Sequence, residues 1–317
     1  MKPGLPCLRA AALALLLSAS AVHAGAPSDP APAGAASAVP GQVVVQGPRL
    51  RLSVGGTSNW RTYCARPGVA SCAEFDVRED PATAGTSVDQ RASVYLGFAV
   101  EAEALPFAQR DSWLRGLGAA LEYAHGFNRL GINRSAGGAS TPTETLTAQE
   151  LTLGAAALYR HPFTLDDRGL LLPGYVGLRA GAQQRTFVLE GEAHLEFNTH
   201  RLYPLIGLEA LVPLSRRVQV EAGAQLLLAP RTGRALGSAR LRNLELRSFG
   251  ESVSSRGWSA RLGLSGEVWG PFGYAARVQL TRFRDRYTGS GTLAGWNEGG
   301  AAEETLAAAH WAVTARY

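Results

Sequence analysis

The segment 305–317 alternates between apolar and polar or small side chains up to the last residue of the chain. One face of this segment carries Trp311, Val313, Ala315 and Tyr317. A period of two residues is the period of a β-strand, in which successive side chains point to opposite faces. The segment therefore predicts a C-terminal strand that is apolar on one face and ends on an aromatic residue.

A closing strand of this kind resembles those of bacterial outer-membrane β-barrels, which end on an aromatic residue that the barrel assembly machinery reads. The resemblance implies that Trp311, Val313, Ala315 and Tyr317 form the assembly signal. It also implies that the protein lies in the bacterial cell outer membrane, in contact with outer-membrane lipid and lipopolysaccharide. The resemblance concerns architecture and points to no specific family.

Nine further segments between residues 50 and 281 alternate in the same way, most clearly 218–228. Each has about the 9 to 11 residues that cross a bilayer as a tilted strand. The connections 213–216 and 270–271 are short and others are long, which is typical of periplasmic turns and external loops. We therefore expect an all-β protein, an antiparallel transmembrane β-barrel of about ten strands, with eight or twelve strands as alternatives.

Alternation alone does not separate a membrane barrel from a soluble β-sandwich, because both have one apolar face. Two further features favour the membrane barrel. The polar face is rich in glycine, which suits a crowded barrel interior. Aromatic residues of the apolar face gather near segment ends, as at membrane interfaces: Trp113, Tyr123, Tyr159, Trp258, Tyr274 and Tyr317. A soluble periplasmic β-barrel or sandwich that binds a ligand stays an alternative.

The N-terminal part predicts export. Residues 1–24 combine a basic start, an apolar stretch and a small-residue cleavage site, which together predict a signal peptide. Residues 25–41 are rich in Ala, Pro, Gly and Ser and predict a flexible periplasmic lead-in. The barrel domain is expected at 42–317. After residue 24 no apolar run reaches the ~18 residues of a membrane helix, so membrane residence would depend on strands.

Two cysteines follow the predicted signal peptide, Cys64 and Cys72. A lone close pair in an exported protein predicts a disulfide, here in the first external loop. The sequence contains no metal-ligand cluster, phosphate-binding loop or dinucleotide fingerprint, so we expect no cofactor and no metal site.

Charged residues of both signs fall on the face opposite the apolar one. Arg179, Glu209 and Glu221 are predicted at similar height on three successive strands, with Arg261 and Arg277 near them. Ten strands enclose little space, and an unpaired buried charge is costly. We therefore predict a lumen closed by arginine–glutamate pairs. Scattered charges in a water-filled lumen are the alternative.

Arginines also dominate the fourth predicted external loop: Arg231, Arg234, Arg240, Arg242 and Arg247. Arg282 and Arg284 share the lipid-facing parity at the outer end of the ninth predicted strand. Guanidinium groups bind phosphates and carboxylates bidentately, so these residues predict contact with lipopolysaccharide or an acidic surface polysaccharide. A solvated charged loop is the alternative. Because the loop would face the cell exterior, nucleic acid is not an expected partner.

The sequence offers one weak match to a catalytic motif. Omptin proteases are ten-stranded barrels that use an Asp-x-His pair, and the nearest match here is Glu192-Ala193-His194. A solvated hairpin tip around Gly191 explains these residues better. We therefore predict a monomer with a non-enzymatic envelope role, as a structural anchor, a surface-binding protein or a narrow channel. A barrel enzyme acting on lipid or peptide is the alternative.

Overall fold

The structure, a computed structural model, describes residues 48–77, 85–92, 94–110, 112–136, 139–140, 144–167, 170–189, 198–215, 217–228, 231–232 and 247–317. The chain divides into two compact units, 1–43 and 44–317, and every described residue belongs to the second. The predicted signal peptide and lead-in therefore lie outside the described residues, and their boundaries stay predictions.

In the described part of the chain, one antiparallel sheet contains thirteen β-strands. They are β1 Leu50–Pro67, β2 Ser87–Ala92, β3 Tyr95–Ala104, β4 Leu117–Ala136, β5 Ala139–Ser140, β6 Glu144–Asp167, β7 Leu170–Leu189, β8 Thr199–Pro213, β9 Gln219–Leu227, β10 Arg231–Thr232, β11 Ser252–Trp269, β12 Phe272–Thr288 and β13 Gly300–Arg316. A short α-helix, α2 Cys72–Asp76, follows β1, and a 3₁₀ helix, η1 Trp113–Gly116, precedes β4.

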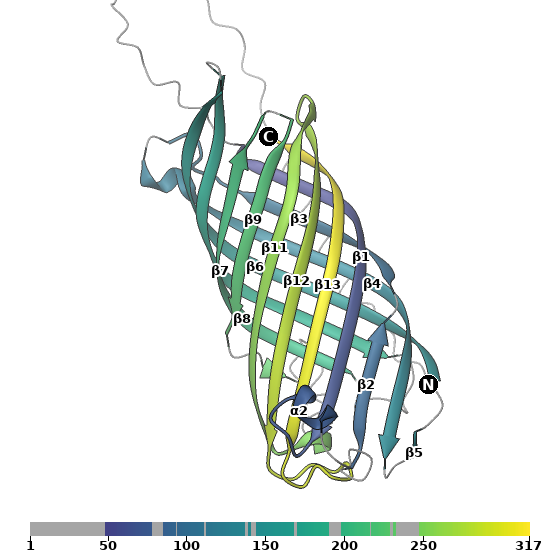
Figure 1. Ribbon diagram of the computed structural model, residues 1–317. Helices are drawn as coiled ribbons and strands as arrows, with labels where there is room; N and C mark the ends of the chain where they lie inside the picture. The colour runs from purple at the N-terminus through teal and green to yellow at the C-terminus, as the bar shows by residue number, and fades with distance from the viewer. Residues whose placement is uncertain are drawn as a thin grey trace, which may run out of the picture. The chain divides into compact units, whose positions relative to one another are not determined.

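The sheet closes on itself and forms a barrel (Figure 1). The first and last strands pair along their whole length, from Arg51 opposite Arg316 to Pro67 opposite Gly300. Strands β2 and β3 occupy one position in the ring, because both lie between β1 and β4. The two-residue strands β5 and β10 only extend their neighbours. The described ring thus has ten strand positions, which confirms the predicted ten-stranded antiparallel barrel.

The outer wall carries a belt of exposed apolar side chains. Leu208 in the middle of β8 is 60% exposed, and Val54 and Val313 near the paired termini are 58% and 64% exposed. Apolar exposure on this scale is rare on a water-soluble monomer and matches the lipid-facing band of membrane barrels. The apolar faces predicted from the alternation are the outward faces of the strands.

The two ends of the barrel differ. Strands β6 and β7, β8 and β9, and β11 and β12 meet in short turns at one end, the last through Gly270, whose φ of +56° suits glycine. Both ends of the described chain lie at this short-turn end, where the Leu50 N–H donates to the Tyr317 carbonyl at 3.0 Å (Figure 1). The opposite end, here called the loop end, carries the long connections.

The strands are longer than predicted. Strands β4 and β7 have 20 residues each and β6 has 24. At ~3.3 Å per residue and a tilt of ~45°, 20 residues rise by about 45 Å, more than the ~30 Å of a hydrocarbon core. Strands β6 and β7 extend beyond the predicted segments at both ends of the barrel. No helix among the described residues is both long and apolar enough to cross a membrane.

Replacing Leu208 by Arg tests whether the belt faces lipid. Leu208→Arg should lower the free energy of unfolding in lipid vesicles by ~2–4 kcal/mol, the cost of Arg near a bilayer midplane. Leu214, which is equally exposed at 59% in the β8–β9 turn, provides the control. Leu214→Arg should cost ~0–1 kcal/mol, as at an interface. Denaturant titration of both variants in lipid vesicles measures these losses. Equal losses in the free energy of unfolding would contradict a membrane-embedded belt.

Candidate functional site: the charged barrel interior

Arginine–carboxylate pairs fill the interior near the short-turn end. Glu221 on β9 lies 2.8 Å from Arg51 on β1 and 2.8 Å from Arg277 on β12. Arg277 also contacts Glu101 on β3 at 2.6 Å. These four side chains come from four strands, so the chain of ion pairs crosses the lumen instead of following one wall.

A second chain of pairs lies beside the first. Glu209 on β8 accepts hydrogen bonds from Arg160 at 2.6 Å and from Arg261 at 2.8 Å. Arg160 also donates to Glu103 at 2.9 Å, and its guanidinium carbon lies 4.2 Å from the centre of the Tyr175 ring. Glu209 is 3% exposed and Arg160 is 7% exposed. The short-turn half of the lumen is therefore occupied by paired side chains.

Four of the five predicted lumen residues take part in these two chains: Glu209, Glu221, Arg261 and Arg277. The fifth, Arg179, lies inside the barrel but contacts Glu122 on β4 at 3.4 Å. The sequence reasoning missed Arg51, Arg160 and Glu103. Arg51 lies on the same face of β1 as Ser53, which is 5% exposed. Following the alternation of inward and outward residues to the ends of the strands would therefore have placed Arg51 in the lumen.

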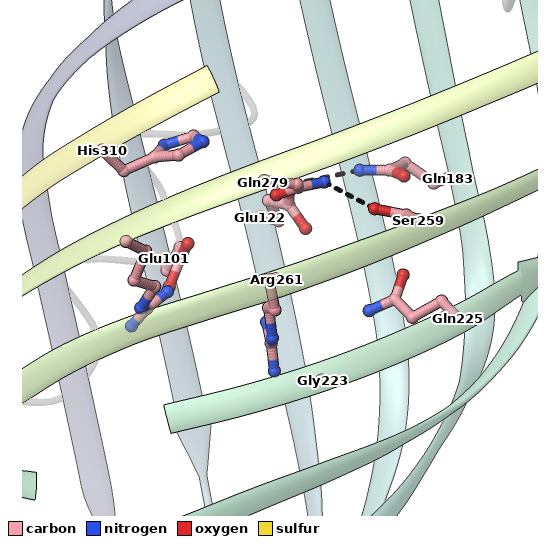
Figure 2. Close-up of a pocket in the computed structure, with 10 residues that line it drawn as sticks. Glu101, Glu122, Gln183, Gly223, Gln225, Ser259, Arg261, Gln279 and His310 are labelled. Carbon is pink, nitrogen blue, oxygen red and sulfur yellow. Dashed lines mark hydrogen bonds and ion pairs between the residues drawn. The ribbon is translucent and has the colours of Figure 1, made fainter. Parts of the chain in front are cut away.

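The middle of the lumen is polar and narrow. Two cavities of about 20 and 50 Å³ lie there, lined partly by Glu122, Gln183, Gln279 and His310. Figure 2 shows Glu122, Gln183, Gln279 and Arg261 directed toward one of these spaces. A water needs at least ~10–15 Å³ of such volume, so each cavity has room for one or a few waters. Neither is a continuous channel.

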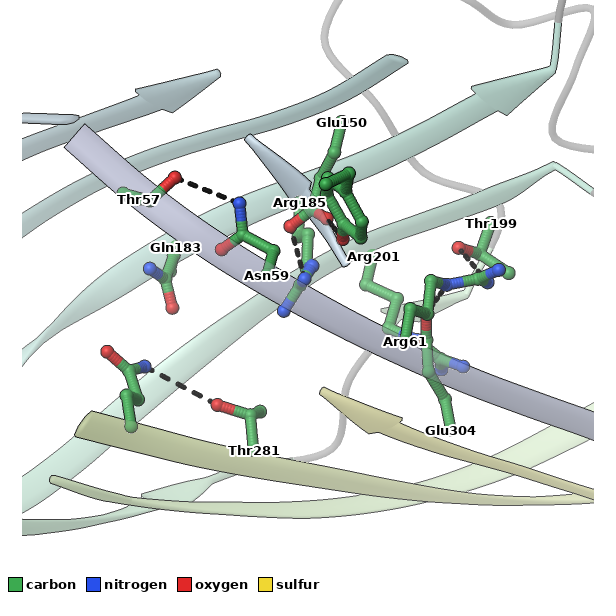
Figure 3. A network of polar contacts seen from close by, with 12 residues as sticks. Thr57, Asn59, Arg61, Glu150, Gln183, Arg185, Thr199, Arg201, Thr281 and Glu304 are labelled. Atoms are coloured by element: carbon green, nitrogen blue, oxygen red, sulfur yellow. Dashed lines mark hydrogen bonds and ion pairs between the residues drawn. The ribbon is translucent and has the colours of Figure 1, made fainter. Parts of the chain in front are cut away.

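A further network of polar side chains lies in the loop-end half of the lumen (Figure 3). Glu304 on β13 accepts from Arg61 at 2.6 Å and from Arg201 at 3.0 Å. Arg201 binds Asp285 through two hydrogen bonds of 2.9 and 2.6 Å. These four side chains are at most 3% exposed. Two parallel N–H···O bonds between Arg and a carboxylate are the strong, geometrically specific form of an ion pair.

An aromatic cluster, here called the aromatic cap, lies next to this network at the loop end. Phe249, Tyr287 and Trp296 pack together and are at most 1% exposed. Trp296 donates its indole N–H to the Thr86 carbonyl at 2.8 Å. Phe187 joins the same apolar cluster and lies 3.8 Å below the guanidinium of Arg61. Sequence reasoning missed the cap because Phe249 and Trp296 belong to long connections without strand periodicity.

Inward glycines make room for the arginines. A Cβ on Gly223 would lie 2.8 Å from Arg261 Nε, and one on Gly263 would lie 2.5 Å from Arg277 Cγ. Real Cβ atoms do not approach other atoms this closely. The glycine-rich polar face noted in the sequence therefore provides the space that the large paired side chains occupy.

The predicted disulfide between Cys64 and Cys72 is present. It joins the loop end of β1 to α2, and Cys64 belongs to the strand and not to a loop. Ser71 caps α2 by accepting the Glu74 N–H at 3.2 Å, a common N-terminal helix signal. The disulfide thus fixes a small helical connection to the barrel wall.

Four arginines project outward at the loop end of β11 and β12, just beyond Trp258: Arg256, Arg282, Arg284 and Arg286. Together they are called the outer arginine patch. Arg256 and Arg284 lie directly opposite each other in the strand register. Glu303 on β13 contacts Arg282 at 2.6 Å and Arg284 at 3.4 Å. One carboxylate therefore faces four guanidinium groups.

Other predicted site residues are placed only in part. Arg247 is described and exposed, and Arg231 lies in β10, but its side chain is outside the described residues. Arg234, Arg240 and Arg242 also lie outside them, as do the residues Glu192-Ala193-His194. Among the described residues, no group of His, Cys, Asp or Glu side chains is arranged to hold a metal ion.

The geometry defines a class of protein, an antiparallel transmembrane β-barrel with arginine–carboxylate pairs in its interior. No protein-family model and no curated protein matches the sequence. Similar solved structures include the outer membrane protease OmpT from Escherichia coli, at 9% identity and a TM-score of 0.46 over 84% of this chain and 96% of that one.

Two further similar structures are also outer-membrane or translocator barrels. The translocator domain of the autotransporter NalP from Neisseria meningitidis matches at 14% identity and a TM-score of 0.36, over 87% of this chain and 91% of that one. The outer membrane protein OprG from Pseudomonas aeruginosa matches at 9% identity and a TM-score of 0.34, over 86% and 97%. At these identities the likeness concerns the fold alone.

Replacing Glu304 by Gln tests the loop-end network. Glu304→Gln leaves Arg61 without a carboxylate partner in a buried site and removes one of the two carboxylates that Arg201 contacts, so the free energy of unfolding should fall by ~3–5 kcal/mol. Glu267→Gln is the matched control, because that side chain is 52% exposed and lies 3.7 Å from Arg316. The control should cost at most ~1 kcal/mol. Urea titrations of the folded barrel in vesicles measure both, and similar small losses would contradict a desolvated network.

Proposed function

We propose that this protein is a bacterial outer-membrane β-barrel with a non-enzymatic envelope role, and that its own side chains close its lumen. The observation that carries the proposal is the pair of ionic layers, one around Glu209 and Glu221 and one around Glu304. Each layer links strands on different sides of the barrel. A selective channel instead lines its pore with rings of one charge sign.

The outer-membrane location is supported by the apolar belt and by the grouping of both described termini at the short-turn end, which in outer-membrane barrels faces the periplasm. The closing strand supports recognition by the barrel assembly machinery. Trp311, Val313 and Tyr317 point outward and are 49%, 64% and 66% exposed. Ala315 shares their face.

A non-enzymatic role is supported by the state of the interior carboxylates. Glu103, Glu209 and Glu221 each contact at least one guanidinium within 3 Å. Each of these carboxylates is already engaged in a structural ion pair and is therefore less available to accept a proton from a substrate. A closed, monomeric barrel that anchors or binds at the cell surface fits this interior better than an enzyme or a pore.

Planar-bilayer recording tests the closed lumen. Wild-type protein should show little or no steady conductance, because paired side chains fill the lumen at two levels. The double variant Glu209→Ala, Glu221→Ala removes the central carboxylate of each short-turn chain, so that Arg51 and Arg261 lose their carboxylate partner and Arg160 and Arg277 keep only one each. The uncompensated arginines should repel one another, so conductance should rise. Glu267→Ala, at the exposed mouth, is the control and should behave as wild type. A large steady wild-type conductance that the double variant leaves unchanged would contradict the proposal.

A second proposal concerns lipopolysaccharide, and the outer arginine patch supports it. Like charges directly opposite each other in a β-sheet destabilise it. Arg256 and Arg284 are opposed in this way, and neither Arg256 nor Arg286 has an ion pair with another described residue. The patch begins beside Trp258, at the edge of the apolar belt, where lipid phosphates lie. We therefore propose that phosphates of lipopolysaccharide neutralise it, and an acidic surface polysaccharide is the second candidate.

Thermal unfolding in detergent with and without lipopolysaccharide tests this proposal. The variant Arg256→Gln, Arg284→Gln should be more stable than wild type without lipopolysaccharide, because the repulsion of ~0.2–1 kcal/mol is removed. It should also lose most of the stabilisation that added lipopolysaccharide gives to the wild type. Arg217→Gln, an exposed arginine at the short-turn end, is the control. Equal stabilisation of all three proteins by lipopolysaccharide would exclude the patch as its binding site. If the double variant loses the stabilisation only with lipopolysaccharide that carries a polysaccharide chain, the acidic surface polysaccharide is favoured as the ligand.

A further inference from the structure

A large cavity opens at the short-turn end of the barrel. Its volume is about 590 Å³, within the ~300–1,000 Å³ typical of small-molecule sites. The residues around it come from the β3–β4 and β11–β12 connections, from the short-turn ends of strands such as β6 and β7, and from both ends of the described chain, including Pro48 and Tyr317. The two ion-pair chains around Glu209 and Glu221 lie on the lumen side of it. The cavity is therefore a blind mouth and not the entrance of a channel.

One wall of the cavity is apolar. Leu172 and Leu211 are 2% and 6% exposed, and Pro162 and Leu171 line the same space. Tyr175 adds an aromatic ring that lies against Arg160. Burying an alkyl group against such a wall is favourable by ~25 cal/mol per Å² of apolar surface. The wall is therefore suited to a hydrocarbon tail.

The lining also contains a cationic group of side chains. Four arginines line the cavity with a single acid, Glu267: Arg51, Arg115, Arg160 and Arg316. Arg51 and Arg160 are paired with carboxylates of the lumen, but the buried Nε of Arg51 has no hydrogen-bond partner among the described residues. The cationic part of the lining therefore contains a donor that nothing in the described protein satisfies.

The other two arginines are only weakly neutralised. Arg316 lies 3.7 Å from Glu267, which is half exposed, and donates to Gln219 at 3.1 Å. Arg115, in η1, has no ion pair with another described residue. Guanidinium groups with free donors bind carboxylate and phosphate strongly. The lining therefore combines guanidinium groups that are available to bind an anion with an apolar wall.

We infer that this cavity binds a small amphiphile with one anionic head group, a carboxylate or a phosphate, and a short hydrocarbon tail. The head group lies between Arg115 and Arg316 and the tail packs against Leu171, Leu172 and Pro162. The paired side chains behind Arg51 block passage into the lumen, so the ligand is captured at the mouth and is not transported through the barrel.

Calorimetric titration of the protein in nanodiscs, measured against empty nanodiscs, tests the inference. Octanoate and octyl phosphate are the anionic probes, and octanol is the uncharged probe with the same tail. At least one anionic probe should bind, and octanol should bind at least tenfold more weakly. The preferred head group distinguishes a carboxylate ligand from a phosphate ligand.

Three variants separate the site from general effects of charge and folding. Arg115→Gln with Arg316→Gln should weaken binding of the anionic probe at least tenfold. Arg217→Gln, at the same end of the barrel but outside the cavity lining, should bind as wild type. Ala108→Trp, which fills the cavity, should weaken binding while all arginines stay in place. Heat-modifiable gel migration confirms that each variant is folded. Binding of octanol as tight as that of octanoate, or unchanged binding by the double arginine variant, would overturn the inference.

Discussion

The structure depends on the requirement that a guanidinium group removed from water must meet a carboxylate. An unpaired charge in a poorly hydrated interior costs several kcal/mol, by order of magnitude, whereas a paired and hydrogen-bonded one is tolerated. In this barrel the partners are far apart in sequence. Arg61 and Glu304 are separated by 243 residues, and Arg51 and Glu221 by 170. These pairs exist only once β13 has closed on β1, so barrel closure and interior pairing depend on each other.

The requirement also explains other features of the wall and the ends. Large paired side chains need space, and inward glycines such as Gly223 and Gly263 provide it. The pairs are strong only where water is excluded, and the aromatic cap around Trp296 covers the loop-end network. On the outer wall, where lipid replaces protein, the exposed side chains are mostly apolar up to the outer arginine patch. In this patch of four arginines, Glu303 is the carboxylate that forms ion pairs, and it contacts Arg282 and Arg284.

The class of fold and the direction of most side chains could be predicted from the sequence, because a bilayer imposes a strict period of two on every strand it contacts. That constraint gives the ten strands, the outward belt, the inward position of Glu209 and Glu221, and the closing strand. The Cys64–Cys72 disulfide followed from the spacing of two cysteines in an exported chain. These predictions share a cause that acts locally along the sequence.

What could not be predicted depends on relations between strands. Beyond the membrane the outward face of a strand no longer has to be apolar, so the alternation does not show where β1 and β6 end. Arg61 and Arg160 lie in these strand extensions, and their positions in the lumen were therefore not predicted. The choice of Glu122 as the partner of Arg179 follows from strand register and tilt, which one sequence does not encode locally. The aromatic cap takes Phe249 and Trp296 from connections that have no periodicity, and the mouth cavity brings the ends of several strands together with residues of such connections.

Side-chain nitrogen NMR of the protein in nanodiscs tests the central claim, a lumen closed by desolvated arginine–carboxylate pairs, most directly. No lysine follows the predicted signal peptide, so the arginine Nε–H region reports on all the permanently cationic side chains beyond it. The account predicts slowly exchanging Nε–H signals for Arg61 and Arg201, which are 1% exposed, and fast exchange for exposed Arg217. Exchange of Arg61 and Arg201 as fast as that of Arg217 would mean that water fills the lumen and would contradict the account.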